Sequence, residues 1–290
     1  MRTRLVLLGT NGGPTVRLDR SAPAQAIVVD GVAYLVDCGE GTVRQLAAAG
    51  IPLSSIEHVF FTHHHADHNL GYGSLLLVSW VTGLQRQLSV HGPAPLAQMT
   101  DAFFAMNAFD LEMRAASTGR PPLTGLVRVE EFSGAEFSGQ EIGGGAVVLE
   151  DDRVRVTAAR VHHPPVEESY AFRFDGPDRS IVISGDTTPC EELIRLATGA
   201  DILVHEVTYP PAIEAVAAGM PHAATLTDHL RDCHTTVEEV GRVAAAAGVG
   251  TLVLSHFVPG DSSVSDAEWA RLAQQGFAGR VIVGRDLLTL

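Results

Sequence analysis

The side chains best suited to chemistry are concentrated in one short segment that follows a run of apolar residues. Four metal-ligating groups stand within six positions: His63, His65, Asp67 and His68. Imidazole and carboxylate groups are ligands for zinc and other borderline divalent metals. The apolar run 56–61 predicts a buried strand, and a strand end before a helix is where α/β proteins place their chemistry. The spacing therefore predicts a metal centre, the alternative being a solvated loop rich in histidine.

Three later segments each place a further candidate ligand after a predicted strand. His162 and His163 follow a strand expected at 154–161, and either of them could ligate a metal. Asp186 stands in the sequence Ser-Gly-Asp-Thr, where it could bind a metal or cap the following helix. His256 follows the strand expected at 251–254. A metal centre would therefore draw its ligands from several strand ends.

The overall composition limits which class of protein and which partners are expected. The chain has 290 residues, 46% of them hydrophobic, which is enough for a large core in a single domain spanning 1–290. A net charge of −14 predicts no strong general affinity for nucleic acid and no membrane partner. The three cysteines are too few and too far apart for a disulfide framework, so we expect a reducing, cytoplasmic location.

Alternating strand and helix patterns indicate an α/β or α+β protein but leave the architecture open. Helices are expected at 69–81, 95–107 and 212–218, each after a predicted strand, and a further helix is expected at 235–247. The pattern between 108 and 125 is mixed. We interpret the region around 95–125 as a helical flap close to the site.

The order of these motifs resembles the metallo-β-lactamase superfamily, and the resemblance covers nearly the whole chain. It implies a four-layer αββα sandwich with two metal ions at one edge, between two halves. The first metal would be bound by His63, His65 and His163, and the second by Asp67, His68 and His256. Asp186 would bridge the two metals.

The resemblance also separates the candidate ligands from their neighbours. It selects His163 over His162 and leaves His64 at a variable position. His65 stands where the flavin-linked diiron branch usually has glutamate, which favours a hydrolase. Asp37 could support a ligand histidine by hydrogen bonding.

Two later motifs resemble the ribonuclease Z branch. Residues 204–208, Val-His-Glu-Val-Thr, are similar to its His-Glu-Ala-Thr motif, and residues 234–236, His-Thr-Thr, to its His-Ser-Thr motif. The resemblance implies that Glu206 orients His234, which would act on the scissile phosphate. The alternative is that both residues cap helices or satisfy buried backbone groups.

The implied activity is phosphodiester hydrolysis by a hydroxide that bridges two divalent metals, most simply Zn²⁺, with Mn²⁺ or Fe²⁺ as alternatives. Asp67 would orient this nucleophile, while His234 would stabilise the transition state or protonate the leaving oxygen. The substrate would be RNA, a nucleotide or another small molecule, and a homodimer is expected from the resemblance.

Two alternatives to a ribonuclease Z-like phosphodiesterase stay open. The segment 89–128 lacks the pattern of the arm with which ribonuclease Z holds tRNA, and 107–114 resembles arylsulfatase-like members. A hydrolase of sulfate esters, lactones or other small esters is therefore the second hypothesis. A non-catalytic metal-binding scaffold is more remote, since every expected ligand position is filled.

Overall fold

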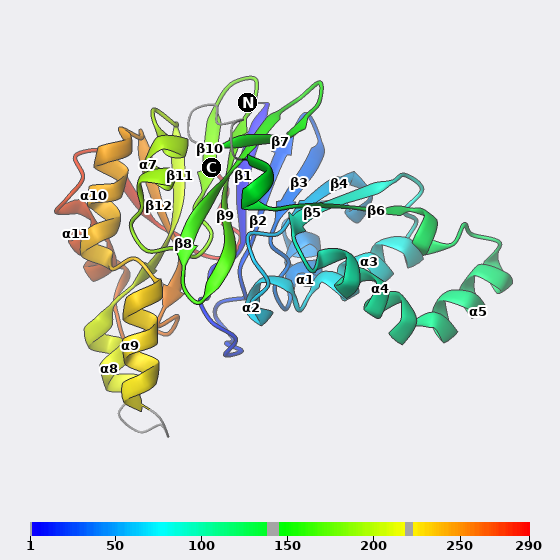
Figure 1. Cartoon of the computed structure of the whole chain (residues 1–290), viewed down its shortest axis with the longest axis horizontal. Coiled ribbons are helices and arrows are strands. Elements are labelled where there is room, and N and C mark those ends of the chain that lie inside the picture. The colour runs from blue at the N-terminus through cyan, green and yellow to red at the C-terminus, as the bar shows by residue number, and fades with distance from the viewer. Residues whose placement is uncertain (1, 138–144, 218–222) are drawn as a thin grey trace.

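Two β-sheets pack face to face between two layers of helices (Figure 1). The computed structural model describes residues 2–137, 145–217 and 223–290. The first sheet has the order β1-β2-β3-β4-β5-β6, and the second has the order β13-β12-β11-β10-β9-β8-β7. The chain therefore completes one sheet before it builds the other.

The first sheet begins with antiparallel strands and continues with parallel ones. Its strands are β1 Thr3–Gly9, β2 Ala24–Val29, β3 Val32–Val36, β4 Ile56–Phe60, β5 Leu88–Pro93 and β6 Val127–Phe132. β2 and β3 join through Asp30 and Gly31, which both have positive φ, as a tight hairpin turn requires. β3 to β6 are parallel and need crossover connections, which bring helices onto the outer face.

The second sheet repeats this plan. Its strands are β7 Ala146–Glu150, β8 Arg155–His163, β9 Val166–Asp175, β10 Ser180–Ile183, β11 Ile202–Thr208, β12 Thr251–Val258 and β13 Arg280–Val283. β7 to β10 are antiparallel, and β10 to β13 are parallel. In both sheets the loops after the parallel strands are thus available for a site.

Helices connect the parallel strands and cover both outer faces. They are α1 Thr42–Ala48, α2 Ala66–Asn69, α3 Tyr72–Val81, α4 Leu96–Met106, α5 Ala108–Thr118, α6 Gly134–Phe137, α7 Glu191–Ala197, α8 Pro210–Ala217, α9 Ala223–Cys233, α10 Val237–Ala247 and α11 Asp266–Gln274. Short 3₁₀ turns lie at Leu53–Ser55 and Leu123–Gly125. Within the described residues, every helix is too short or too polar to span a bilayer.

Three apolar clusters hold the layers together. The inner cluster joins the two sheets, with Phe60 of β4 packed against Phe172 and Phe174 of β9 at ring separations of 5.4 Å. One outer cluster packs α3, through residues such as Trp80, onto the first sheet. The other packs α7, α10 and α11 onto the second sheet. The expected four-layer αββα sandwich is confirmed.

Two expectations about helices are corrected. The helix expected at 69–81 begins only at Tyr72 as α3, and a separate turn, α2, precedes it, because Gly71 N–H donates to the carbonyl of Cys38 (2.8 Å) rather than to a carbonyl of its own helix. α9 was not expected at all, since few of its residues are apolar, although these few recur with helical spacing.

A histidine pair lies within the strands rather than at the site. His58 Nδ1 of β4 and His91 Nε2 of β5 are 3.1 Å apart, and His91 stacks on Phe60 at a ring separation of 4.7 Å. Burial, with smaller contributions from His58 and Arg128, lowers the pKa of His91 to about 3. The folded protein therefore keeps His91 neutral at pH values where an unfolded chain protonates it.

We predict that this histidine makes the fold sensitive to acid. The pKa is lower in the folded than in the unfolded state, so stability is full above pH 6.5 and falls as the pH drops toward 3, by about 1.4 kcal/mol per unit. Between pH 6.5 and 5, urea unfolding of the wild type should lose about 2 kcal/mol more than that of His91→Phe. Replacing the exposed His162 by Phe is the control. An unchanged pH dependence in His91→Phe would contradict the prediction.

Candidate metal centre

The motif after β4 supplies ligands from a loop and from one helical turn. His63 and His65 lie in the loop, while Asp67 and His68 lie in α2. The backbone of Cys38 ties this turn in place, because its N–H donates to the carbonyl of His68 (2.7 Å) and its own carbonyl accepts from Gly71 N–H (2.8 Å). The loop after β3 therefore fixes the direction of α2 and of its two ligand side chains.

The remaining ligands come from the second sheet. His163 ends β8, and Asp186 follows β10. His256 forms a β-bulge in β12: Ser255 pairs with Glu206 and Phe257 with Val207, which leaves His256 as an extra residue with a φ of 47°. The bulge turns this side chain toward the centre, a change of direction that strand alternation alone would not predict.

The seven predicted ligands lie together as two groups around one carboxylate. Asp186 Oδ2 is 3.9 Å from both His63 Nε2 and His163 Nε2 on one side. On the other side it is 3.4 Å from His68 Nε2 and 3.2 Å from His256 Nε2. Asp186 therefore lies between the groups, in the position expected of a bridging ligand.

The spacing within each group fits a metal ion. His65 Nδ1 is 3.0 Å from His63 Nε2 and 3.2 Å from His163 Nε2, and the Nε2 atoms of His68 and His256 are 3.2 Å apart. Asp67 Oδ2 completes the second group at 3.5 Å from His68 and 3.4 Å from His256. Tetrahedral zinc with Zn–N bonds near 2.0–2.1 Å places its ligand atoms roughly 3.3 Å apart. The donor set and its spacing thus suit two such ions.

The structure distinguishes the neighbouring histidines. The His163 side chain is buried, and its Nδ1 lies 2.8 Å from the Cys233 carbonyl oxygen, which leaves Nε2 facing the centre. His162 is exposed, and His64 turns away so that its Nε2 lies 2.7 Å from the carbonyl of Pro93. The geometry therefore favours His163 as the ligand.

Charges in the centre are strongly coupled. Burial alone would lower the pKa of His68, but the carboxylates of Asp186, Asp67 and Asp37 outweigh it and raise that pKa well above its usual value. Burial alone would raise the pKa of Asp186, whereas His256 and His68 hold it well below its usual range. Asp186 thus stays ionised, which favours a cation beside it.

Asp37 supports the centre from behind. Its Oδ2 lies 2.8 Å from His68 Nδ1, and its Oδ1 accepts the backbone N–H of Thr62 at 2.9 Å. A carboxylate on the far nitrogen fixes the ring orientation of a ligand histidine and increases its basicity. The hydrogen bond that the sequence suggested is therefore present.

Glu206 and His234 form the expected pair beside the ligands. His234 Nδ1 is 2.9 Å from Glu206 Oε1, which also accepts Thr187 N–H at 2.9 Å. Burial opposes the charged imidazole, but Glu206 outweighs it and raises the pKa of His234 well above its usual value. The His234 ring lies 5.0 Å from that of His163 and 5.8 Å from that of His256. A protonated imidazole can thus reach a group bound at the centre.

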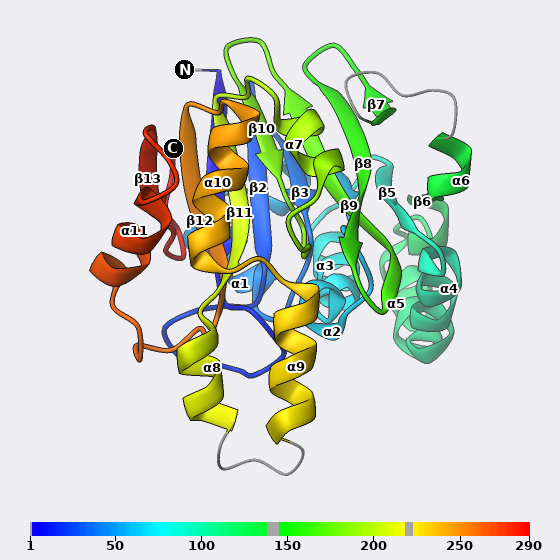
Figure 2. The ribbon, with the colours of Figure 1, turned by 60° about the vertical axis from the view of Figure 1, so that its left-hand side comes forward.

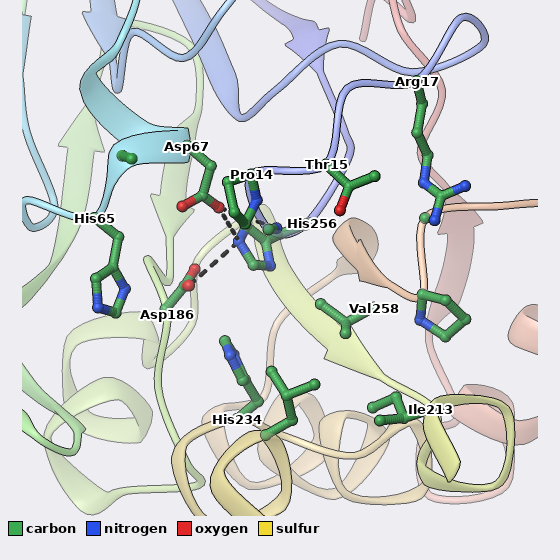
Figure 3. A pocket seen from close by; sticks show the side chains of 16 residues that line it. Pro14, Thr15, Arg17, His65, Asp67, Asp186, Ile213, His234, His256 and Val258 are labelled. Atoms are coloured by element: carbon green, nitrogen blue, oxygen red, sulfur yellow. Dashed lines mark hydrogen bonds and ion pairs between the residues drawn. The ribbon is translucent and has the colours of Figure 1, made fainter. Parts of the chain in front are cut away.

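A cavity of about 530 Å³ opens onto this centre (Figure 3). His65, Asp67, Asp186, His234 and His256 line one end. The other end is mostly apolar and is lined by Pro14, Ile213, Leu230, Val258 and Pro259, together with Thr15 and Arg17. The cavity is large enough for a ligand of nucleotide size.

The walls of this cavity differ from those expected. Among the described residues, none from 95–125 lines it, and Figure 1 shows α4 and α5 at the end of the molecule opposite α10 and α11. The segment is helical, but its described residues do not form part of this cavity's wall. α8 and α9 form the wall instead, beside the loop after β1 (Figure 2).

Comparison with known proteins agrees with this geometry. The profile of the beta-lactamase superfamily domain matches residues 33–257. The ribonuclease Z of Mycobacterium bovis (strain BCG / Pasteur 1173P2) is 32% identical, with 98% of this chain and 96% of the relative covered. That of Mycobacterium marinum (strain ATCC BAA-535 / M) is 33% identical, with 98% and 96% covered.

The chain belongs to the metallo-β-lactamase superfamily. Within this superfamily it is ribonuclease Z-like, a metal-dependent hydrolase of phosphodiester bonds. The human short-form tRNase Z has the same fold, with a TM-score of 0.70, 22% identity, and 99% of this chain and 98% of that chain covered. The metallo-β-lactamase fold protein YhfI of Bacillus subtilis also gives a TM-score of 0.70, at 19% identity and the same coverage.

We predict that Asp37→Asn weakens metal binding without unfolding the protein. An amide can still hydrogen-bond, but it removes the negative charge behind His68, and such supporting residues contribute roughly 10–100-fold in metal affinity. Competition with a chromogenic chelator measures the change. Asp151→Asn, a carboxylate that binds Tyr34 away from the centre, is the control. Equal affinities for both variants would show that Asp37 does not act on the ligands.

Proposed function

We propose that this chain hydrolyses phosphodiesters at a centre of two divalent metal ions. One ion would be held by His63, His65 and His163, the other by Asp67, His68 and His256, with Asp186 shared. The observation that carries this proposal is the position of Asp186 Oδ2, within 3.9 Å of histidine nitrogens of both groups. We propose zinc for both positions, because the donor set is rich in imidazole; manganese and iron also accept such ligands.

The side chains around the centre have distinct roles in this mechanism. Two divalent cations supply Lewis acidity that activates water and polarises the phosphoryl group. Asp67, whose Oδ2 accepts Gly13 N–H at 3.0 Å, orients the attacking water. His234, kept protonated by Glu206, donates a hydrogen bond to the phosphoryl group or a proton to the leaving oxygen. An alkoxide leaving group needs such a proton most.

The substrate class has two candidates. The relatives are named ribonuclease Z, which supports an RNA substrate. The cavity supports a second candidate, a small diester with an apolar group, because Arg17 is the one Arg or Lys among its described lining residues and already pairs with Asp261 at 3.3 Å. RNA affinity depends on positively charged groups that neutralise several phosphates, and Arg17 is one such group only.

We propose a cytoplasmic homodimer as the working form. Support for the location comes from three free cysteines. Support for self-association comes from Met106, Phe109 and Met113, which are exposed on α4 and α5. Light scattering would give the mass, and a monomer at micromolar concentration would contradict the dimer.

The function is tested by comparing kcat/KM for bis-p-nitrophenyl phosphate and p-nitrophenyl sulfate in the metal-loaded protein. We expect a strong preference for the phosphodiester. His234→Ala should lower kcat by about 10²-fold if His234 stabilises the transition state, since the aryl leaving group needs little protonation.

Metal content and His162→Ala are the controls for this assay. The exposed His162 should be dispensable. A preference for the sulfate, with His234 dispensable, would move the protein to the arylsulfatase-like members. Less than one bound metal per chain, with no activity after zinc or manganese is added, would favour a non-catalytic scaffold.

Salt dependence separates the two substrate classes. If a tRNA substrate contacts basic groups only through Arg17, log(kcat/KM) should fall with log[salt] at a slope of about −1 or less steeply. A slope several times steeper would show that RNA binds a wider basic surface and would exclude the small-diester assignment. Bis-p-nitrophenyl phosphate, which carries one charge, is the reference substrate.

A further inference from the structure

A second, much smaller cavity lies directly behind the metal centre. Its volume is about 20 Å³, and its lining includes the carboxylates Asp186 and Glu206. Gln25, on β2 of the first sheet, and Ser255, on β12 of the second, line it as well. This chamber, as we call it, is thus bounded by both sheets. Because a buried water needs roughly 10–15 Å³, the chamber has room for one.

Five lining residues share an unusual feature, a buried polar atom with no hydrogen-bond partner among the described residues. Four of these atoms are oxygens, Gln25 Oε1, Asp186 Oδ1, Glu206 Oε2 and Ser255 Oγ, and the fifth is the ring nitrogen His256 Nδ1. All five residues are almost fully buried, with exposures of 5% or less. Buried polar groups are nearly always hydrogen-bonded, so five such atoms around one chamber indicate a shared partner.

The donors and acceptors around the chamber call for a partner that can do both. Gln25 Oε1, Asp186 Oδ1 and Glu206 Oε2 can only accept hydrogen bonds when the two carboxyl groups are ionised. Ser255 Oγ carries one hydrogen, and His256 Nδ1 carries one when Nε2 faces the metal. A water molecule can accept from these two donors and donate its own two hydrogens to two of the three acceptors. A metal ion is a poorer occupant, because Gln25 and Ser255 are neutral and the adjacent centre is already cationic when loaded.

We propose that the chamber binds one ordered water molecule, and that Gln25 and Ser255 are positioning residues that act through it. The water fixes the second oxygen of Asp186, whose first oxygen faces both histidine groups. It also fixes the second oxygen of Glu206, whose first oxygen orients His234. The water site is inferred from the geometry of the chamber alone, whereas its effect on turnover rests on the proposed phosphodiesterase function.

The chamber residues on β12 and β11 connect the proposed water both to a metal ligand and to His234. Ser255 and Glu206 are partners in the register of these parallel strands, and the bulge at His256 follows immediately. A water held there contacts the residue before one metal ligand and the carboxylate behind His234. Loss of the water should therefore loosen metal binding and reduce kcat together, while substrate binding, and with it KM, changes little.

A crystal structure of the metal-loaded protein tests the site itself. We expect a water within hydrogen-bond distance of at least two of the five atoms. In Ser255→Ala and in Gln25→Leu this water should disappear. Direct bonds among the five side chains, with no water between them in the wild type, would overturn the proposal.

Solution measurements test the positioning role. In Ser255→Ala and Gln25→Leu we expect chelator-driven metal release to accelerate about tenfold and kcat for bis-p-nitrophenyl phosphate to fall about tenfold, with KM unchanged. Because both residues hold the same water, the double variant should be no worse than either single variant. Ser79→Ala, which removes a buried hydroxyl in α3, is the matched control.

The outcomes separate this proposal from the proposed function. Additive effects in the double variant, or effects equal to those of Ser79→Ala, would overturn the positioning role. Metal release and crystallography need no substrate, so both still test the chamber if the protein hydrolyses no phosphodiester. Thermal unfolding of each variant establishes that it is folded before the comparison.

Discussion

The buried carboxylate of Asp186 is the constraint on which the rest of the structure depends. It lies between two groups of histidines that come from both sheets, and it remains ionised because His256 and His68 outweigh the cost of its burial. A charge in this position is tolerable only if cationic partners surround it. The sandwich has to bring four separate strand ends to one point to provide them.

The backbone shows how those strand ends are brought together. Parallel strands end on the same edge of their sheet, which places the loop after β4 at one edge of the first sheet and the loop after β10 at one edge of the second. His256 is the exception, and the bulge in β12 redirects it at the cost of a positive φ. Asp37 and the chamber then hold the ligands from behind, so that orientation is set by tertiary contacts rather than by the ligands alone.

Chemistry and substrate selection are carried by different parts of the fold. The ligands, Glu206 and His234 lie on strand ends fixed by the core, which suits a reaction that needs rigid geometry. The outer cavity is built from the loop after β1 and from α8 and α9, segments that contribute little to the sandwich core. Members of one superfamily can therefore keep the metal centre and differ in substrate.

The sequence by itself determined which side chains can bind metal. Their residue types and their short spacing are local properties of the chain and can be recognised without the fold. His63, His65, Asp67 and His68 could be recognised from one segment, and the later motifs from their similarity to a family. The resemblance selected His163 over His162, and in the structure His163 faces the centre. Only the tertiary structure decided that α8 and α9 rather than residues 95–125 wall the cavity, and that Gln25 reaches the chamber. Hydrophobic periodicity states which face of an element is buried but not which element covers it, since that choice depends on long-range packing.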